Sequence, residues 1–291
     1  MKVLVVRKRT SLDLFGEYVR KKVSDELMAE ESLLKMQRSH FEHSQALALL
    51  HDSLDKEKIA YEDVSHGQYW PETESFDAVI AVGGDGTVLD ASHHIDQEDT
   101  SIIGIRSSPG SVGHLCYCGR EQIESAIKAL KSKKLKFAKV IRLKAKIHSL
   151  NSQADLLTSP ILNDFLFCNE SPAATTHYQI TFREHSERQK SSGIWISTPA
   201  GSSAAMKAAG GQLMSPECEE FQFIVRELYQ PPEGKHGIVG GVFDPDVDLL
   251  SIENLCDRAV LALDGHHRLH RLSYGDRLSF MRGPSLSLAR R

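Results

Sequence analysis

The chain has 291 residues, of which 41% are hydrophobic and 25% are charged, so it can form one large or two ordinary globular domains. Its 35 Lys and Arg residues nearly balance its 39 Asp and Glu residues, which argues against a broad surface for nucleic acid or for an anionic membrane. The longest apolar runs, at residues 3–6 and 78–82, are far shorter than the ~20 residues that span a bilayer, and the charged residues after the first run do not fit a secretory signal. We therefore expect a cytoplasmic protein with no nucleic-acid and no membrane partner.

The first hundred residues alternate between apolar strands and helices. Strands are predicted at residues 2–6, 61–64, 77–82 and 101–105, and helices at about 24–58 and after residue 87. Because the strands are almost continuously apolar and helices separate them, the pattern predicts a parallel sheet that is covered on both faces. We expect this α/β domain to occupy residues 1–130.

A different pattern follows residue 120. One more helix is predicted at residues 122–130, and the short alternating segments after it, separated by turn residues, predict an antiparallel β-rich domain. These segments are residues 140–148, 161–167, 178–182, 193–198, 221–226, 259–263 and 278–281. A helical stretch at 202–209 interrupts them and ends at two glycines. The charged runs at 131–136 and 183–190 are expected to be solvated faces or hairpin loops.

Neither the cysteines nor the histidines form a convincing metal site. The five cysteines are scattered and odd in number, which does not fit a disulfide framework. Cys116 and Cys118 have no second Cys/His pair at zinc-finger spacing, and the alternation of residues 115–118 suits a strand. The histidine pairs at residues 93–94 and 266–267 are expected on a helix and on a strand, where adjacent side chains diverge. We therefore assign no metal ligand.

The glycine-rich turn at residues 83–87, with the sequence GGDGT, follows the strand expected at 77–82. Its glycines permit positive φ angles and close approach of another molecule to the backbone, and its N–H groups suit phosphate. Asp85 has the wrong charge for a plain phosphate cradle, so we interpret it as a general base for a hydroxyl that attacks a phosphoryl group. The string matches neither the dinucleotide-binding motif nor the P-loop. The alternative is a tight turn in which the aspartate caps a helix.

The string at residues 82–87 resembles the GGDGT signature that NAD kinases share with diacylglycerol and sphingosine kinases and, more loosely, with phosphofructokinases. Three further strings decide in favour of the NAD kinases. They are ILNDF at 161–165, GIWISTPAGSSA at 193–204 and VLALDGH at 260–266, which resemble the family's N-E/D, STPTGSTA and DGQ motifs. The strings at residues 104–107, 113–116 and 189–193 resemble the mitochondrial-type branch and its bacterial relatives.

The resemblance implies a fold and a reaction. The fold would be a Rossmann-like α/β domain over residues 1–130, a β-sandwich-like NAD-binding domain over 131–275, and a C-terminal segment, 276–291, that returns to the first domain. NAD would bind between the two domains. ATP would phosphorylate NAD at the adenosine ribose 2′-hydroxyl to give NADP, with Mg²⁺ arriving with ATP. The chain would form a homo-oligomer, a dimer or a tetramer.

The resemblance also implies roles for individual residues. Asp85 aligns with the proton acceptor, and Gly86 with a neighbouring contact to NAD. Asn163 and Asp164 align with the pair that contacts the dinucleotide, and His266 takes the place of a glutamine that is frequent in the family. The full implied nucleotide-binding set is Gly83, Gly84, Gly86, Thr87, Asn163, Asp164, Lys190, Ser192, Thr198, Ser203, Ala204, Ala208 and His266.

Three residues depart from the family's pattern. Ser192 stands in place of a carboxylate, Ala205 in place of an aromatic residue, and Ala200 in place of a hydroxyl residue. These changes concern the contacts to the nicotinamide ribose and the diphosphate, and with them the choice between NAD and NADH. The choice between ATP and polyphosphate is also open. Two other functions are retained as alternatives: a sensor of NAD(P) without turnover, and a lipid kinase of the GGDGT superfamily.

Overall fold

The computed structural model describes residues 1–25, 27–65, 69–98, 100–110, 112–149, 154–231 and 234–290. The chain divides into two compact units: unit 1 comprises Met1–Ala138 and Leu286–Arg291, and unit 2 comprises Lys139–Ser285. These bounds differ from the limits at residues 130 and 276 that the sequence suggests. The division falls inside two strands, β6 (Lys136–His148) and β17 (Arg277–Arg290), whereas the change of periodicity in the sequence marks only the end of the helix before β6.

Unit 1 is built on a parallel sheet. The strands are β1 (Lys2–Arg7), β2 (Ala60–Ser65), β3 (Ala78–Gly83), β4 (Ser101–Arg106) and the short β5 (Cys118–Gly119), together with the end of β17. They lie in the order β17, β4, β3, β1, β2, with β5 also beside β4. Every residue of β3 is buried, as expected for an apolar strand inside a parallel sheet. Because the strands are parallel, the carboxyl ends of β1, β3 and β4 share one edge of the sheet.

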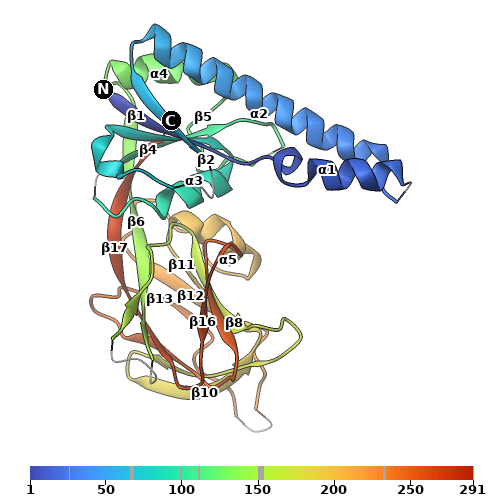
Figure 1. Ribbon diagram of the computed structural model, residues 1–291. Helices are drawn as coiled ribbons and strands as arrows, with labels where there is room; N and C mark the ends of the chain where they lie inside the picture. Colours follow the sequence, from blue (N-terminus) through green and yellow to red (C-terminus); the bar gives the residue numbers. More distant parts are fainter. Residues whose placement is uncertain are drawn as a thin grey trace. The chain divides into compact units, whose positions relative to one another are not determined.

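Helices cover both faces of this sheet (Figure 1). The helices and short 3-10 turns of unit 1 are α1 (Ser11–Ser24), α2 (Glu30–Lys56), η1 (Thr73–Ser75), α3 (Asp85–Ser92), η2 (Arg120–Gln122) and α4 (Ile123–Lys131). On one face, α2 and α4 pack through Leu50 and Ile127 onto Val5 and Ile80. On the other face, α3 packs through the buried Val88. No helix in the described part of the chain is long and apolar enough to cross a membrane.

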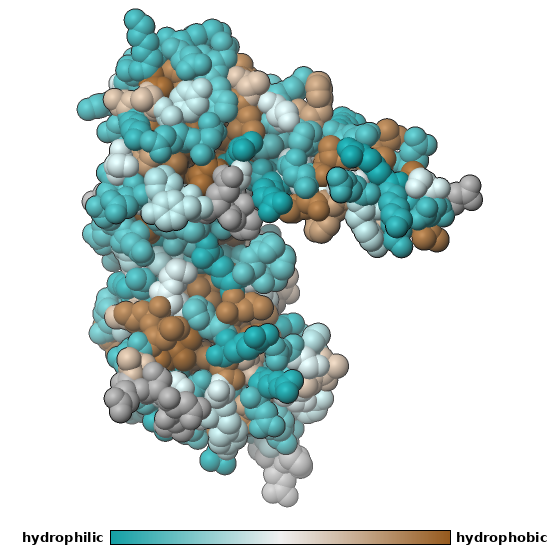
Figure 2. Space-filling view, in the orientation of Figure 1, coloured by the Kyte–Doolittle hydropathy of each residue, from teal (hydrophilic) through white to brown (hydrophobic). Residues whose placement is uncertain are grey.

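Helix α1 is not indicated by the sequence pattern, although its start is well defined. The Asp13 N–H donates to Thr10 Oγ1, and the Asp13 carboxylate accepts from the Thr10 N–H, which forms a capping box. The helix packs along the first half of α2, and this pair extends beyond the sheet as an arm (Figure 1). Val19 faces inward and is buried, whereas Phe15 and Tyr18 are 56% and 60% exposed; apolar atoms are visible on the arm in Figure 2. Because apolar residues lie on both its inner and outer surfaces, α1 lacks a single apolar stripe.

Unit 2 contains two sheets of antiparallel strands. In the first sheet, β13, β12, β11, β8, β15 and β16 lie in this order; in the second, β10, β9, β14 and β17 lie in this order, and β6 pairs with β17 and β7. The strands are β7 (Leu156–Leu157), β8 (Asp164–Asn169), β9 (Thr176–Phe182), β10 (His185–Ser191), β11 (Gly193–Ser197), β12 (Phe221–Arg226), β13 (Gly240–Phe243), β14 (Leu250–Asn254), β15 (Ala259–Leu263) and β16 (Arg268–Leu272).

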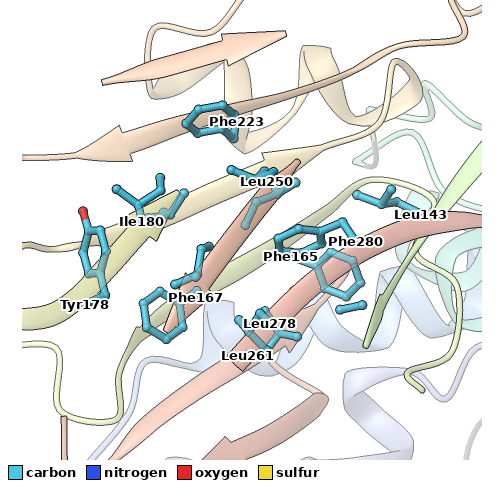
Figure 3. Packing of buried hydrophobic residues seen from close by; sticks show 14 of the residues in the cluster. Leu143, Phe165, Phe167, Tyr178, Ile180, Phe223, Leu250, Leu261, Leu278 and Phe280 are labelled. Carbon is cyan, nitrogen blue, oxygen red and sulfur yellow. The ribbon is translucent and has the colours of Figure 1, made fainter. Parts of the chain in front are cut away.

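The core of unit 2 lies between these two sheets (Figure 3). Phe165 and Phe167 come from β8 in the first sheet, and Tyr178 and Phe280 come from β9 and β17 in the second. The Phe167 and Tyr178 rings meet edge to face with centroids 5.8 Å apart, and the Phe165 and Phe280 centroids are 5.9 Å apart. Two sheets that share one apolar layer form a β-sandwich. An α/β first unit and a β-rich second unit confirm the expected fold class.

Two local expectations from the sequence are wrong, whereas the expectation for the charged run at residues 183–190 agrees with the structure. Most of this run forms β10, and the side chains of the run are largely solvated apart from the buried Gln189. Residues 115–117 do not form a strand, and only the two residues of β5 pair with β4. The stretch at 202–209 is not one helix but a 3-10 turn, η3 (Ala200–Ser203), followed by the four-residue α5 (Ala205–Ala208).

The histidine pairs also lie elsewhere than expected. His266 and His267 occupy the turn between β15 and β16, and their ring centroids are 3.8 Å apart, so the divergence expected on a strand does not apply. His93 follows the last residue of α3. Within the described ranges, no group of three or more His, Cys, Asp or Glu side chains is placed so that it could hold a metal ion.

Candidate functional site

The glycine turn links β3 to α3 at the carboxyl edge of the unit 1 sheet. Gly84 is extended, with φ −145° and ψ −164°, and the helix begins at Asp85. A Cβ atom on Gly83 would lie 2.0 Å from Thr87 Oγ1 and 2.9 Å from Thr87 Cβ. The first glycine is therefore required by the protein itself, because the buried Thr87 side chain occupies the space of a larger residue.

Gly86 differs from Gly83 in this respect. A Cβ atom on Gly86 would meet no atom within 4 Å, and the residue is exposed. The N–H groups of Thr87 and Val88 donate to the Gly84 carbonyl at 3.0 and 3.3 Å, and these are the first hydrogen bonds of the turn and its helix. The N–H groups of the two residues before them have no partner inside the helix. Open space beside backbone donors at a helix start suits a negatively charged ligand.

The Asp85 carboxylate is held by a distant loop of unit 1. Its Oδ2 accepts from the N–H groups of Gly113 and His114 at 3.0 and 3.1 Å, and its Oδ1 accepts from the N–H of Leu115 at 2.7 Å. A carboxylate offers about four lone-pair positions, so three are used and one, on Oδ1, is left. Asp85 therefore anchors this loop and still has a position that can accept a proton.

Two residues outside the implied site set, His43 and Ser107, support the same edge, and the sequence indicates Ser107 only within the string at 104–107. Ser107, just after β4, donates its N–H to the Gly83 carbonyl at 2.9 Å, and its hydroxyl lies 3.0 Å from His43 Nδ1. Burial, together with the nearby Lys8 ammonium, lowers the pKa of His43 to about 4. The imidazole is therefore neutral near pH 7. No local pattern links His43 to the turn, because 64 positions separate it from Ser107.

In unit 2, the Asp264 carboxylate holds the turn at Asn163 by accepting backbone hydrogen bonds, as Asp85 holds its loop in unit 1. The Asp264 Oδ1 accepts from the N–H groups of Asn163 and Asp164 at 2.7 and 3.0 Å, and Oδ2 accepts from the N–H of Leu162 at 2.9 Å. The Asp264 N–H in turn donates to the Asp164 carbonyl at 2.9 Å. The conformation of this turn thus depends on a carboxylate about one hundred positions away. Sequence reasoning quoted Asp264 within a motif but did not include it among the site residues.

The STPAG segment packs directly against the same turn. The Thr198 N–H donates to the Asn163 carbonyl at 2.9 Å, and the Thr198 hydroxyl donates to the Leu162 carbonyl. A Cβ atom on Gly201 would lie 2.1 Å from the Asn163 carbonyl oxygen, so only glycine fits there. The structure therefore brings Asn163, Asp164 and Thr198 together in unit 2.

Asp164 is the carboxyl group of this cluster whose pKa differs most from its ordinary value. Its side chain is 6% exposed, and no residue in the described ranges donates a hydrogen bond to its carboxyl oxygens. Burial first, and then the negative charge of Asp264, raise the pKa of Asp164 to about 7. Three N–H groups stabilise negative charge on Asp264, whereas none of them donates to the Asp164 carboxyl group. A carboxyl group that holds its proton near neutral pH is typical of functional sites.

The other implied residues of unit 2 fall into two groups. Ser203, Ala204 and Ala208 are exposed: Ser203 ends η3, Ala204 links η3 to α5, and Ala208 ends α5. His266 is exposed in the turn that begins with Asp264. Lys190 and Ser192 lie elsewhere: Lys190 is exposed on β10, and Ser192 precedes β11. Ser192 lies five residues before Ser197, which is about 17 Å along a strand. Within one chain, these two residues are therefore not grouped with Asn163.

The raised pKa of Asp164 predicts how stability depends on pH. The folded pKa of about 7 lies above the ordinary value of 3.8, so folding favours the protonated acid. Burial of the Asp164 carboxyl group therefore costs no unfolding free energy below about pH 4. The cost increases as the pH rises through 7, because the buried group must then lose its proton. Asp164→Asn has no such titration. The free energy of unfolding of this variant, relative to wild type, should rise by about 1–4 kcal/mol between pH 5 and pH 8 in urea denaturation.

A difference between the two proteins that stays constant from pH 5 to pH 8 would contradict this prediction. It would mean that Asp164 is ionised throughout this range.

Comparisons with known proteins agree with these features. Residues 12–134 match the family model of the ATP-NAD kinase N-terminal domain. The chain is 27% identical over 258 residues to a probable NADH kinase of Oryza sativa subsp. japonica (81% of this chain, 77% of that protein), and 29% identical over 252 residues to the NADH kinase of Arabidopsis thaliana (80% and 78%). The crystal structure of an NAD kinase from Archaeoglobus fulgidus in complex with ATP has a TM-score of 0.67 at 18% identity, over 98% of this chain and 93% of that chain. Together, the family model and the plant relatives support membership of the NAD kinase family.

Proposed function

We propose that this protein is an ATP-dependent NAD kinase, which transfers the terminal phosphoryl group of ATP to the adenosine ribose 2′-hydroxyl of NAD and forms NADP. One observation carries the mechanism: the Asp85 carboxylate is fixed by three N–H groups, yet keeps one free lone-pair position on Oδ1 at an open glycine turn. The family relatives support the reaction, and neither a non-catalytic sensor nor a lipid kinase is favoured.

In this mechanism Asp85 is the general base. A sugar hydroxyl is a poor nucleophile, so its proton must leave as its oxygen forms a bond to the terminal phosphorus. Asp85 accepts that proton, the bond between this phosphorus and the bridging oxygen breaks, and ADP keeps the electron pair. General-base assistance of this kind contributes about 10²–10⁴ in rate, and positioning of the phosphates contributes the rest. The N–H groups of Asp85 and Gly86, which have no partner within α3, would bind phosphate oxygens.

The residues of unit 2 would bind the dinucleotide. Asn163 offers an amide, and Asp164 a protonated carboxyl, and together they can donate to and accept from adenine or ribose hydroxyls. The exposed, small side chains of Ser203, Ala204 and Ala208 leave the backbone accessible to a flat ligand. His266 would contact the nucleotide from the turn after Asp264. Lys190 and Ser192 stay predictions from the resemblance, because they lie at the far end of β11, away from Asn163.

Mg²⁺ would enter as part of the Mg·ATP substrate, because phosphate oxygens and waters provide most of its ligands.

We also propose that the chain forms a homo-oligomer. Membership of the mitochondrial-type branch and a cytoplasmic location stay predictions from the sequence. Since both plant relatives are named NADH kinases, NADH is a second phosphoryl acceptor to be tested beside NAD.

The reaction can be tested with purified protein, Mg·ATP and either NAD or NADH. Chromatographic separation of the products should show NADP or NADPH formed with an equal amount of ADP. Inorganic polyphosphate in place of ATP tests the phosphoryl donor, and light scattering during size-exclusion chromatography gives the oligomeric state. Binding of NAD without any phosphorylated product would contradict the proposed function and support a sensor.

Asp85→Asn should lower both turnover and stability. The amide has only one accepting oxygen, so at least one N–H of the loop at residues 113–115 loses its partner, which costs about 1–3 kcal/mol of unfolding free energy. Loss of the base should lower kcat about 10²–10⁴-fold at saturating NAD. Urea denaturation and initial rates measure the two effects.

Asp264→Asn is the matched control for this variant. It breaks the same kind of three-donor arrangement in unit 2, so its stability loss should be similar, and its main kinetic effect should be a raised KM for NAD. If Asp264→Asn lowers kcat as much as Asp85→Asn does, the base assignment is wrong.

Gly86→Ala should separate ligand binding from stability. The added methyl group meets no protein atom, and alanine is the better helix former, so stability should be unchanged or higher by up to about 1 kcal/mol. The same methyl group would occupy the space proposed for the substrate, so kcat/KM should fall about tenfold or more. Gly83→Ala is the control, and it should destabilise the fold because its Cβ would clash with Thr87. If Gly86→Ala has wild-type kinetics, the substrate does not bind in the space beside Gly86.

A further inference from the structure

Lys8 lies beside the glycine turn but has no role in the mechanism described so far. It is the first residue after β1, and its N–H donates to the Val82 carbonyl at 3.2 Å, which continues the pairing of β1 with β3. Its Cβ atom is 3.3 Å from the position that a Cβ on Gly83 would occupy. The Lys8 side chain therefore starts beside the turn that precedes Asp85.

The Lys8 ammonium is half-buried and has no anionic partner at contact distance. In the part of the chain that the structure describes, it makes no ion pair and no side-chain hydrogen bond. Burial lowers its pKa, and the carboxylate of Glu42 opposes this effect. Glu42 itself is engaged by the Ser108 hydroxyl at 2.6 Å and by Arg38 Nε at 3.2 Å.

The groups around Lys8 do not neutralise it. His43 faces it from α2, and the charge of Lys8 contributes to the lowered pKa of that imidazole, so the ring stays neutral. Removing a cation from water without a partner costs free energy, and proteins retain such an arrangement mainly where a ligand supplies the opposite charge. In α/β sheets, ligands bind at the carboxyl ends of the strands, which is where Lys8 lies.

We propose that the Lys8 ammonium binds phosphate oxygens of the phosphoryl donor in the kinase reaction. This inference rests on the proposed function. Lys8 forms and breaks no covalent bond: the ribose oxygen bonds to the terminal phosphorus, the bridging oxygen leaves on ADP, and Asp85 takes the proton. The ammonium supplies positive charge where the transferred group carries negative charge, as lysines do in other phosphoryl-transfer sites.

Lys8→Met tests this role, because methionine keeps the unbranched stem and removes the charge. Thermal unfolding without ligand should show equal or higher stability, since an unpaired half-buried charge is gone. Titration with Mg·ATP should show at least about tenfold weaker binding, and kcat/KM for ATP should fall about 10²-fold. Lys8→Arg should recover part of the Mg·ATP affinity and part of the kcat/KM for ATP.

Lys2→Met is the matched control, at the start of the strand that Lys8 follows. The Lys2 ammonium pairs with the exposed Glu62 at 2.7 Å, so its loss should change neither ATP binding nor turnover. The same titrations with inorganic polyphosphate show whether Lys8 serves that donor as well.

Three results would overturn the inference: wild-type ATP affinity in Lys8→Met; lost stability in Lys8→Met that accounts for its lost activity and that arginine does not restore; or no binding of either donor to the wild type. Failure of the proposed function is distinguishable. In that case the wild type forms no phosphorylated NAD or NADH, yet Mg·ATP still binds it and binds Lys8→Met more weakly.

Discussion

One interaction, used twice, holds the parts of this protein on which the site depends: an aspartate carboxylate that accepts hydrogen bonds from three successive backbone N–H groups. Asp85 holds residues 113–115 in unit 1, and Asp264 holds residues 162–164 in unit 2. Hydrogen bonds to a charged acceptor are stronger than neutral ones, and three of them fix a loop that has no regular secondary structure. Asp264 therefore sets the backbone from which Asn163 and Asp164 project, and Asp85 fixes a loop of unit 1 beside the glycine turn.

The two anchors differ in what they leave available. Asp264 fixes the turn that carries Asn163 and Asp164, and its charge helps Asp164 to keep a proton. Asp85 both anchors a loop and is the proposed base, so the remaining lone pair on its Oδ1 is the one that would accept the proton. The glycines divide in the same way: Gly83 and Gly201 are required by neighbouring protein atoms, whereas the space beside Gly86 is open.

Local patterns predict most of the strands and the helices that cover them, because a buried parallel strand or an amphipathic helix is visible within one short segment. They also identify Asp85 and Asn163 through motifs. They do not reveal α1, whose apolar residues face two sides, nor the roles of His43 and Asp264, whose partners are 64 and about one hundred positions away. Long-range backbone contacts of this kind leave no periodic signal in a single sequence.

Hydrogen exchange of individual backbone amides, measured by NMR on the ligand-free protein, tests the anchoring role of the two aspartates most directly. The amides of residues 113–115 and 162–164 should exchange at least about 100-fold more slowly than in an unstructured chain, because each donates to a carboxylate in the folded state. Protection of residues 162–164 should be lost in Asp264→Ala, while that of residues 113–115 remains. Exchange of either triplet at the rate of an unstructured chain in the wild type would contradict the account.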